Sequence, residues 1–335
     1  MPGVALHFHL ADHALHSWRA RVEAPPFDAD DPVALNAFYH GAVGPDLGYF
    51  PGGRRILSDL AHCVRTGALA RVLIRSARTV RERAFAWGWL THFLADRAVH
   101  PLIGQGVGEL LTGSRDRFVD GSSHPLAHLR VEMGVDAAVA ERAPEVRRRR
   151  LSDVFDADSV GFLVRAYATT YGVAVAPEEF LRSHRATTRR VGQALGSMGV
   201  MAALMRGTGF PVVPVIRGAL RAAYRNSALR SLSLAYLNPV PPAPWLMEAV
   251  DQQVARYSEV FMEHYASGAA DLPDVNLDTG RPLDLEDGHP GTLRALEGLA
   301  RLAEHTEGTR TPVPAVQEDL LLPAVLGSVR RPAEA

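Results

Sequence analysis

The chain has 335 residues, of which 47% are hydrophobic and 22% charged, as expected for a globular protein with one large core or two domains. Its formal net charge of −1 offers no basic surface to nucleic acid, and all 36 basic residues are arginines, which excludes Schiff-base catalysis and a lysine general base. The single cysteine, Cys63, excludes an internal disulfide framework.

The first residues, MPGVALHFHLADHAL, lack the basic start and the uninterrupted apolar run of a signal peptide. The longest apolar stretch, Ala194–Met205, is too short to span a hydrocarbon layer of roughly 30 Å. We therefore expect a cytoplasmic protein without a transmembrane segment.

Apolar residues recur at helical spacing along the chain and runs of period two are nearly absent, so we predict an all-α fold, a multi-helix bundle. Asp31 and Thr79 are the expected N-caps of two helices, and Gly67 is expected to end another. In chain order, the predicted helices cover residues 3–22, 32–42, 54–67, 68–77, 80–101, 104–111, 124–141, 156–206 with an interruption near 172–177, 245–267 and 291–305.

The chemistry is concentrated towards the N-terminus, because ten of the fourteen histidines precede residue 130. We expect residues 1–150 to form a metal-binding helical core. Residues 151–335 would add helices that pack on this core and shape a cleft, all within one structural domain. The segment 207–245 alternates apolar helix with proline-stiffened connections.

The predicted helix that ends near Pro101 carries His92, Asp96 and His100 at i, i+4 and i+8 within an apolar run. These three side chains lie within about an 80° sector of the helix. Burial of an aspartate costs several kcal/mol unless the carboxylate is paired or bound to a metal. The stripe is therefore either a core Asp–His pair or part of a metal site.

Further histidines and acids at comparable positions favour the metal site. His128 and Glu132 repeat the i, i+4 spacing on a second helix, and Asp46 lies on a glycine-rich loop, 41–53. Mixed imidazole and carboxylate ligands are typical of zinc. The candidate metal ligands are His7, Asp46, His62, His92, Asp96, His100, His128 and Glu132.

These motifs resemble those of the zinc-dependent phospholipase C family of Gram-positive bacteria, which is related in fold to the S1/P1-type nucleases. The resemblance covers roughly residues 5–136 and rests on LHFHLADHAL, GAVGPD, LAHCVRTG, THFLADRAVHP and HLRVE, which occur in the family's order. It implies an all-helical protein that binds two or three zinc ions in a cleft.

The resemblance also implies how the ligands are shared among the ions. Asp46, His62, His92 and Asp96 would hold one zinc, with Asp96 bridging to another. A second zinc would take His100, His128 and Glu132.

His7, with Asp96, would hold the third zinc. Secreted members complete that site with the terminal amine and an indole-bearing first residue, whereas six residues precede His7 here, so His9 and His13 are alternatives. His124 is an alternative to His100, because the spacing from Asp96 to His100 is shorter than in the secreted enzyme.

The implied activity is zinc-dependent hydrolysis of a phosphodiester by attack of metal-bound hydroxide, with Asp46 as a ligand that also takes the proton. The expected partner is a phosphodiester or another small-molecule substrate. The apolar segment 194–245 could make a transient contact with a lipid surface, although packing in the core is the commoner fate of such residues.

Three alternatives remain open at the level of sequence. An S1/P1-type nuclease would stack bases on aromatic rings, for which Phe38, Tyr39, Tyr49 and Phe50 are candidates, but the near-neutral charge argues against nucleic acid. A tailoring hydrolase would use the same metals on a small intracellular metabolite. A non-catalytic protein would keep a structural metal in a closed shell of protein ligands.

Overall fold

A computed structural model of the chain describes residues 3–21, 25–205, 240–282 and 288–309. In these ranges the chain forms α-helices, one short 3-10 helix and no strand beyond an isolated bridge between Val275 and Pro282, which confirms the predicted all-α fold. The helices are α1 (Val4–Arg21), α2 (Pro32–Gly41), α3 (Arg55–Cys63), α4 (Thr66–Ser76), α5 (Val80–Thr112), α6 (Pro125–Arg142), η1 (Val146–Arg148), α7 (Gly161–Tyr171), α8 (Pro177–Met205), α11 (Pro244–Ala266) and α12 (Pro290–Thr309).

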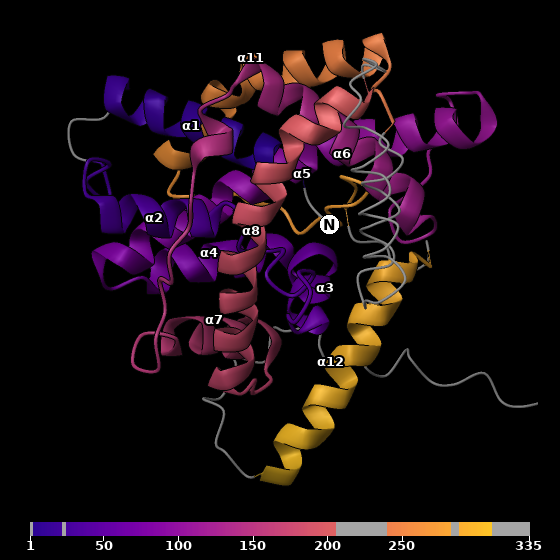
Figure 1. The fold of residues 1–335 in the computed structure, drawn as a ribbon. Helices are drawn as coiled ribbons and strands as arrows, with labels where there is room; N and C mark the ends of the chain where they lie inside the picture. The colour runs from indigo at the N-terminus through magenta and orange to yellow at the C-terminus, as the bar shows by residue number, and fades with distance from the viewer. Residues whose placement is uncertain (1–2, 22–24, 206–239, 283–287, 310–335) are drawn as a thin grey trace, which may run out of the picture.

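The longest helix, α5, is the centre of the bundle. It contacts α1, α2, α4, α6 and α11, and Figure 1 shows it among these neighbours. The helix begins with a capping box, in which the Thr79 hydroxyl accepts from the Glu82 N–H and the Glu82 carboxylate accepts from the Thr79 N–H. Within the described ranges, no helix combines the length and apolarity that crossing a membrane requires.

The structure corrects the prediction that the helix breaks at Pro101. α5 continues through this proline to Thr112 and absorbs the separately predicted helix 104–111. An internal proline removes one main-chain hydrogen bond, so the helix must be held from outside at this point. Gly280 packs there, so closely that a Cβ on it would lie 2.8 Å from Cγ of Pro101.

Gly67 does not end a helix, contrary to the prediction. α3 stops at Cys63, and Arg65 adopts a left-handed conformation with φ of 50°, after which Gly67 lies in the first turn of α4. A Cβ on Gly67 would come within 2.4 Å of the Pro273 carbonyl oxygen. This glycine therefore permits close approach of a distant segment, which local sequence signals cannot reveal.

Two glycines let α2 and α5 cross in direct main-chain contact. A Cβ on Gly41 would lie 2.0 Å from the Phe85 carbonyl oxygen, and one on Gly88 would lie 2.0 Å from the Phe38 carbonyl oxygen. This crossing brings the loop that follows α2, with its carboxylate at Asp46, onto the polar face of α5.

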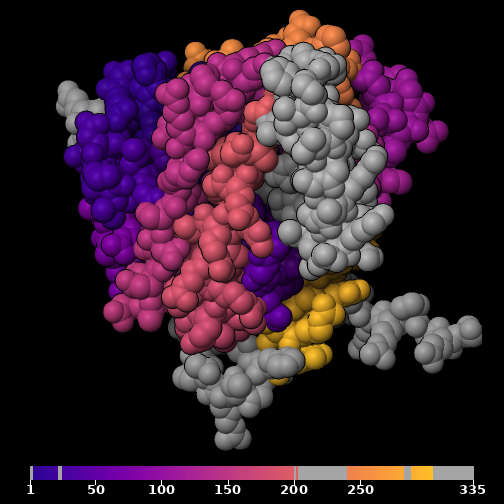
Figure 2. All heavy atoms as spheres, in the orientation of Figure 1, coloured from indigo at the N-terminus to yellow at the C-terminus, as the bar shows by residue number. Residues whose placement is uncertain are grey.

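The later helices pack on the first six. α8 contacts α6, and α12 contacts α3. Figure 2 shows the side chains of α8 running across one face of the molecule, with α12 at the lower edge. In the predicted lipid-contact segment, Met198 and Met201 are buried, and residues 206–239 lie outside the described ranges. The division at residue 150 stays a prediction.

Candidate metal centre

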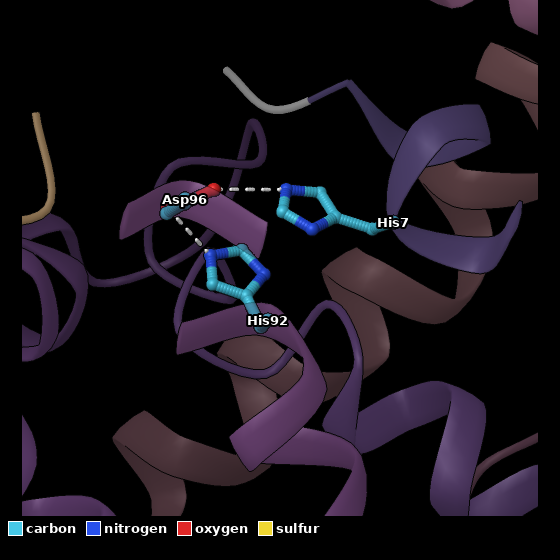
Figure 3. A group of neighbouring side chains, drawn as sticks. All are labelled: His7, His92 and Asp96. Atoms are coloured by element: carbon cyan, nitrogen blue, oxygen red, sulfur yellow. Dashed lines mark ion pairs between the residues drawn. The ribbon is translucent and has the colours of Figure 1, made fainter. Parts of the chain in front are cut away.

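The polar stripe of α5 lies in the interior of the molecule and faces three other helices and a loop. All eight candidate ligands are buried, from His92 with no exposed surface to His100 with 8%. Figure 3 shows three of them converging, with His7 approaching from α1 towards His92 and Asp96 on α5. α3 contributes His62.

Asp96 stands at the middle of the cluster, and its two oxygens face different groups. Oδ2 lies 3.0 Å from His92 Nε2 and 3.3 Å from His62 Nε2. Oδ1 lies 3.2 Å from His7 Nε2 and 3.4 Å from His100 Nε2. Asp96 therefore lies between two sets of imidazoles, one facing each of its carboxylate oxygens.

Main-chain carbonyls fix the orientation of two of the imidazoles. His62 Nδ1 lies 2.8 Å from the Ser58 carbonyl oxygen, and His92 Nδ1 lies 3.0 Å from that of Ala42. A carbonyl can only accept, so each Nδ1 carries the hydrogen and each neutral ring has its lone pair on Nε2. These two Nε2 atoms lie 3.4 Å apart, and the carboxylate oxygens of Asp46 and Asp96 face them.

A second group is formed by α5 and α6. Glu132 Oε1 lies 3.2 Å from His100 Nε2 and 3.0 Å from His128 Nε2. His124, the alternative to His100, is exposed at the N-cap position of α6. Of the two, the structure brings His100 into the cluster.

His7 is the residue of α1 that reaches the centre. Its ring stacks on that of His92 with centroids 4.0 Å apart, whereas the rings of His9 and His13 contact each other. α1 is held here by Asp136, whose carboxylate accepts hydrogen bonds from the main-chain N–H groups of Ala5 and Leu6 at 3.0 and 2.9 Å.

Asp136 was not among the predicted site residues. Its spacing of four residues from Glu132 is the signal that could have found it, since it continues the stripe of His128 and Glu132 along α6. Burial raises the pKa of Asp136 to about 7, against the lowering effect of the two N–H groups that it accepts.

Burial and neighbouring charges act in opposite directions on the pKa values of several ligands in the cluster. For His62, burial lowers the pKa, but hydrogen bonds from a protonated Nε2 to Asp46 and Asp96 raise it to about 10, so a metal ion would bind at Nε2 in place of that proton. Burial likewise opposes ionisation of Asp96, yet the positive charge of His100 is the largest of the effects that hold its pKa well below the usual value. The central carboxylate is therefore ionised, as metal binding requires.

The donor atoms present fit zinc. In the described ranges, three triads of nitrogen and oxygen atoms in this centre each lie within 4.8 Å of one another: His7, His92 and Asp96; Asp46, His62 and His92; and His100, His128 and Glu132. Oxygens of Asp46, Asp96 and Glu132 are buried without a hydrogen-bond partner. Such orphaned carboxylate oxygens, converging with imidazole lone pairs, are what a cation would satisfy.

A cavity of about 20 Å³ adjoins the cluster, and His7, Asp96, His100 and Glu132 are among the residues that line it. This volume is enough for one water molecule or ion.

A fourth group of metal-ligand type lies beside the centre and was not predicted. It consists of Asp120, Asp278 and His289, which come from three separate segments. No short-range spacing connects these residues, so only the tertiary structure could reveal the group.

The aromatic residues considered for base stacking are not surface platforms. Phe38, Tyr39 and Phe50 are buried in the core. Tyr49 is partly exposed, but its ring lies against His62 and its hydroxyl donates to Asp59. No described feature therefore favours a nuclease.

Comparison with curated proteins and with solved structures gave no match. The sequence model of the family described as zinc-dependent phospholipase C matches residues 6–179, which is more than half of the 335 residues. The matched segment contains all eight candidate ligands, from His7 to Glu132. The chain therefore belongs to the zinc-dependent phospholipase C family.

Proposed function

We propose that the chain is a zinc-dependent hydrolase that cleaves a phosphodiester, with two or three zinc ions held by the eight buried ligands. The convergence of imidazole lone pairs and orphaned carboxylate oxygens around Asp96 is the observation that carries this proposal. Zinc in this centre would supply Lewis-acid activation of a water molecule and would stabilise charge in an in-line displacement at phosphorus.

The residues of the chain have distinct roles in this proposal. Asp96 links the groups, because each of its oxygens faces a different set of imidazoles. The carbonyls of Ser58 and Ala42 keep the Nε2 lone pairs of His62 and His92 aimed at the centre. Their rings therefore need no reorientation on binding a metal.

Asp46 has a second role as proton acceptor. One of its oxygens lies 3.3 Å from His62 Nε2, and the other, Oδ2, is buried with no hydrogen-bond partner. Because Oδ2 makes no hydrogen bond and lies 3.5 Å from His92 Nδ1, it is suited to take the proton from the attacking water. The cytoplasmic location and the transient lipid contact stay predictions.

Metal analysis tests the metal centre directly. Protein purified after expression in zinc-supplemented medium should contain two or three equivalents of zinc. Fewer than one equivalent of bound transition metal would contradict the proposal.

Asp96→Asn is the sharpest single substitution. The amide keeps the shape of the carboxylate but removes its charge, so the variant should lose at least one zinc equivalent. Loss of a residue that only supports a metal ligand lowers activity by roughly 10- to 100-fold, and loss of Asp96 should lower it further. Helical circular dichroism should be largely unchanged. Asp251→Asn, at an exposed ion pair with Arg142, is the control and should behave as the parent protein. Full retention of zinc and activity in Asp96→Asn would mean that Asp96 is only a core acid.

Substrate class is tested by assaying the zinc-loaded protein on phosphatidylcholine vesicles, a soluble aryl phosphodiester and single-stranded DNA. We expect hydrolysis of the first two, and hydrolysis of DNA alone would favour the nuclease alternative.

A further inference from the structure

The segment between α11 and α12, which lies beyond the family match, reaches the metal centre. The N–H of Leu277 donates to the carbonyl of His62 at 2.8 Å, which ties the segment to the end of α3. Gly280, with φ of 68°, packs against Pro101 of α5. These two contacts place Asp278 beside His100, the residue that precedes the proline.

Asp278 faces the outer nitrogen of His100. The Nε2 atom of His100 points to Asp96 and Glu132, whereas Nδ1 lies 3.5 Å from Oδ1 of Asp278. This Nδ1 is buried and makes no hydrogen bond within the described ranges, so its contact with Asp278 is one of ion-pair distance. A ligand histidine whose second N–H points to a carboxylate has a fixed tautomer and a fixed ring orientation.

The other side of Asp278 is surrounded by donors. The Ser122 hydroxyl donates to Oδ2 at 3.3 Å, and the same hydroxyl accepts from Arg294 at 3.2 Å. His289 Nε2 lies 3.8 Å from Oδ2 of Asp278 and 3.3 Å from Oδ1 of Asp120.

Hydrogen-bond direction decides what His289 can do in this group. The main-chain N–H of Asp278 donates to Oδ1 of Asn276 at 2.8 Å, which fixes the amide so that Nδ2 is the donor to His289 Nδ1 at 2.9 Å. The N–H of Thr292 in the first turn of α12 also donates to this Nδ1, at 3.3 Å. His289 Nδ1 therefore carries the lone pair, and Nε2 carries the hydrogen.

This direction separates the group from a metal site. Asp120, Asp278 and His289 have the residue types of a fourth metal triad, but the Nε2 that faces the two carboxylates bears a hydrogen and cannot coordinate a metal in the neutral ring. The His289 side chain is nine-tenths buried, and its Nε2 makes no hydrogen bond within the described residues but lies 3.3 Å from Asp120 Oδ1 and 3.8 Å from Asp278 Oδ2.

We propose that Asp278 is a positioning residue of the metal centre, which orients His100 from outside the coordination shell, and that His289 and Ser122 hold Asp278 in place. This inference rests on the proposed zinc centre. It assigns a role to residues 276–282 and 288–289, through which the N-terminus of α12 is linked to the second zinc group by way of His289, Asp278 and His100.

The test compares zinc affinities of single substitutions, with zinc alone as the ligand and a chromophoric chelator as competitor. Asp278→Asn should lower the affinity for one of the bound zinc ions by about 10- to 100-fold. The affinities for the more tightly bound zinc ions should stay within about twofold of those of the parent protein. With cobalt in place of zinc, the visible absorption of that one site should shift, which a purely structural effect would not cause. Asp271→Asn, on the exposed part of the same loop, is the matched control and should match the parent protein.

His289→Asn provides an independent variant. An asparagine side chain can still accept from the first turn of α12, but it removes the Nε2–H group. We expect His289→Asn to lower the zinc affinity of the same site. The decrease should be smaller than in Asp278→Asn. Unchanged affinity and unchanged cobalt absorption in both variants would overturn the inference.

Asp120→Asn separates positioning from direct binding. Asp120 belongs to the fourth group but does not face His100, so this variant should keep the zinc stoichiometry of the parent protein. Loss of a full equivalent in Asp120→Asn would mean that the group is itself a metal site. A parent protein that binds no zinc would refute the proposed function, whereas a zinc-loaded, active parent with unaffected variants would refute only the role of Asp278.

Discussion

Buried histidines of two kinds occur in the molecule, and the difference lies in what faces their rings. Those of the metal centre face carboxylates. His40 and His184 instead face each other, with ring centroids 4.2 Å apart, away from the cluster. Nε2 of His184 accepts a hydrogen bond from the main-chain N–H of Val154 at 2.8 Å, so protonation of that nitrogen would break the bond.

The His40–His184 pair predicts a loss of stability in mild acid. Burial lowers the pKa of His184 from 6.5 to about 4, and it lowers the pKa of His40 as well. Between pH 6.5 and 4 the unfolded chain therefore binds more protons than the folded chain at His184, so the free energy of unfolding falls as pH falls. The contribution of His184 is on the order of 3 kcal/mol by pH 4.

Urea unfolding at pH 7.5, 6 and 5 measures this effect. The parent protein should lose stability with falling pH more steeply than His184→Gln, which has no titratable ring. His16→Gln, at an exposed position of α1, should keep the parent slope. Parallel pH dependences for the parent protein and His184→Gln would contradict the assignment.

At the scale of the elements, the crossing of α2 and α5 is what allows the metal centre to form. The main-chain contact at Gly41 and Gly88 brings the carbonyl of Ala42 to His92, and the loop after α2 carries Asp46 to the same place. A larger residue at either glycine would separate the helices. Helix propensity alone would favour replacing Gly88 by alanine, so the packing and the local preference are opposed.

Two glycine-to-alanine substitutions test this opposition. Gly88→Ala should destabilise the protein by about 1–3 kcal/mol, because its methyl group overlaps the Phe38 carbonyl, and it should weaken zinc binding at the group that contains His92. Gly196→Ala, where a Cβ meets nothing within 4 Å on α8, should stabilise by about 0.5–1 kcal/mol. Equilibrium unfolding and zinc titration measure both, and equal effects of the two substitutions would contradict this account of the crossing.

For the whole molecule, zinc should act as a cross-link between elements. The ligands come from α1, α3, α5, α6 and the loop that carries Asp46. A ligand that binds only the folded state stabilises it by about 2.7 kcal/mol at a free concentration of 100 times the dissociation constant. Thermal unfolding should therefore shift to lower temperature in the presence of a chelator and recover when zinc is added back.

Magnesium is the control for this experiment. It prefers six oxygen ligands, so it should not restore the stability of the chelated protein. Equal unfolding temperatures with chelator and with excess zinc would show that the cluster is held by its internal ion pairs alone.

The sequence by itself determined the class of fold and the set of candidate ligands. Helical periodicity and the N-caps at Asp31 and Thr79 are local properties, and the structure has helices where they predict them. The polar stripe on α5 can also be predicted from the sequence, since residues spaced four apart lie on one face of a helix regardless of what packs on that face. The same spacing favours His100 over His124, since His100 shares the helix face of His92 and Asp96, and the structure places His100 beside Glu132.

Only the tertiary structure decided the features that depend on contacts between distant segments. Gly67 and Pro101 have the local signals of helix ends, but neither ends a helix. Gly67 permits the close approach of residues 272–273, and Gly280 packs against Pro101 where α5 continues through this proline. The tautomers of His62 and His92 depend on main-chain carbonyls, and the approach of Asp278 to His100 depends on a loop far along the chain. Periodicity reports which face of a helix is polar; it carries no information about the partner that this face meets.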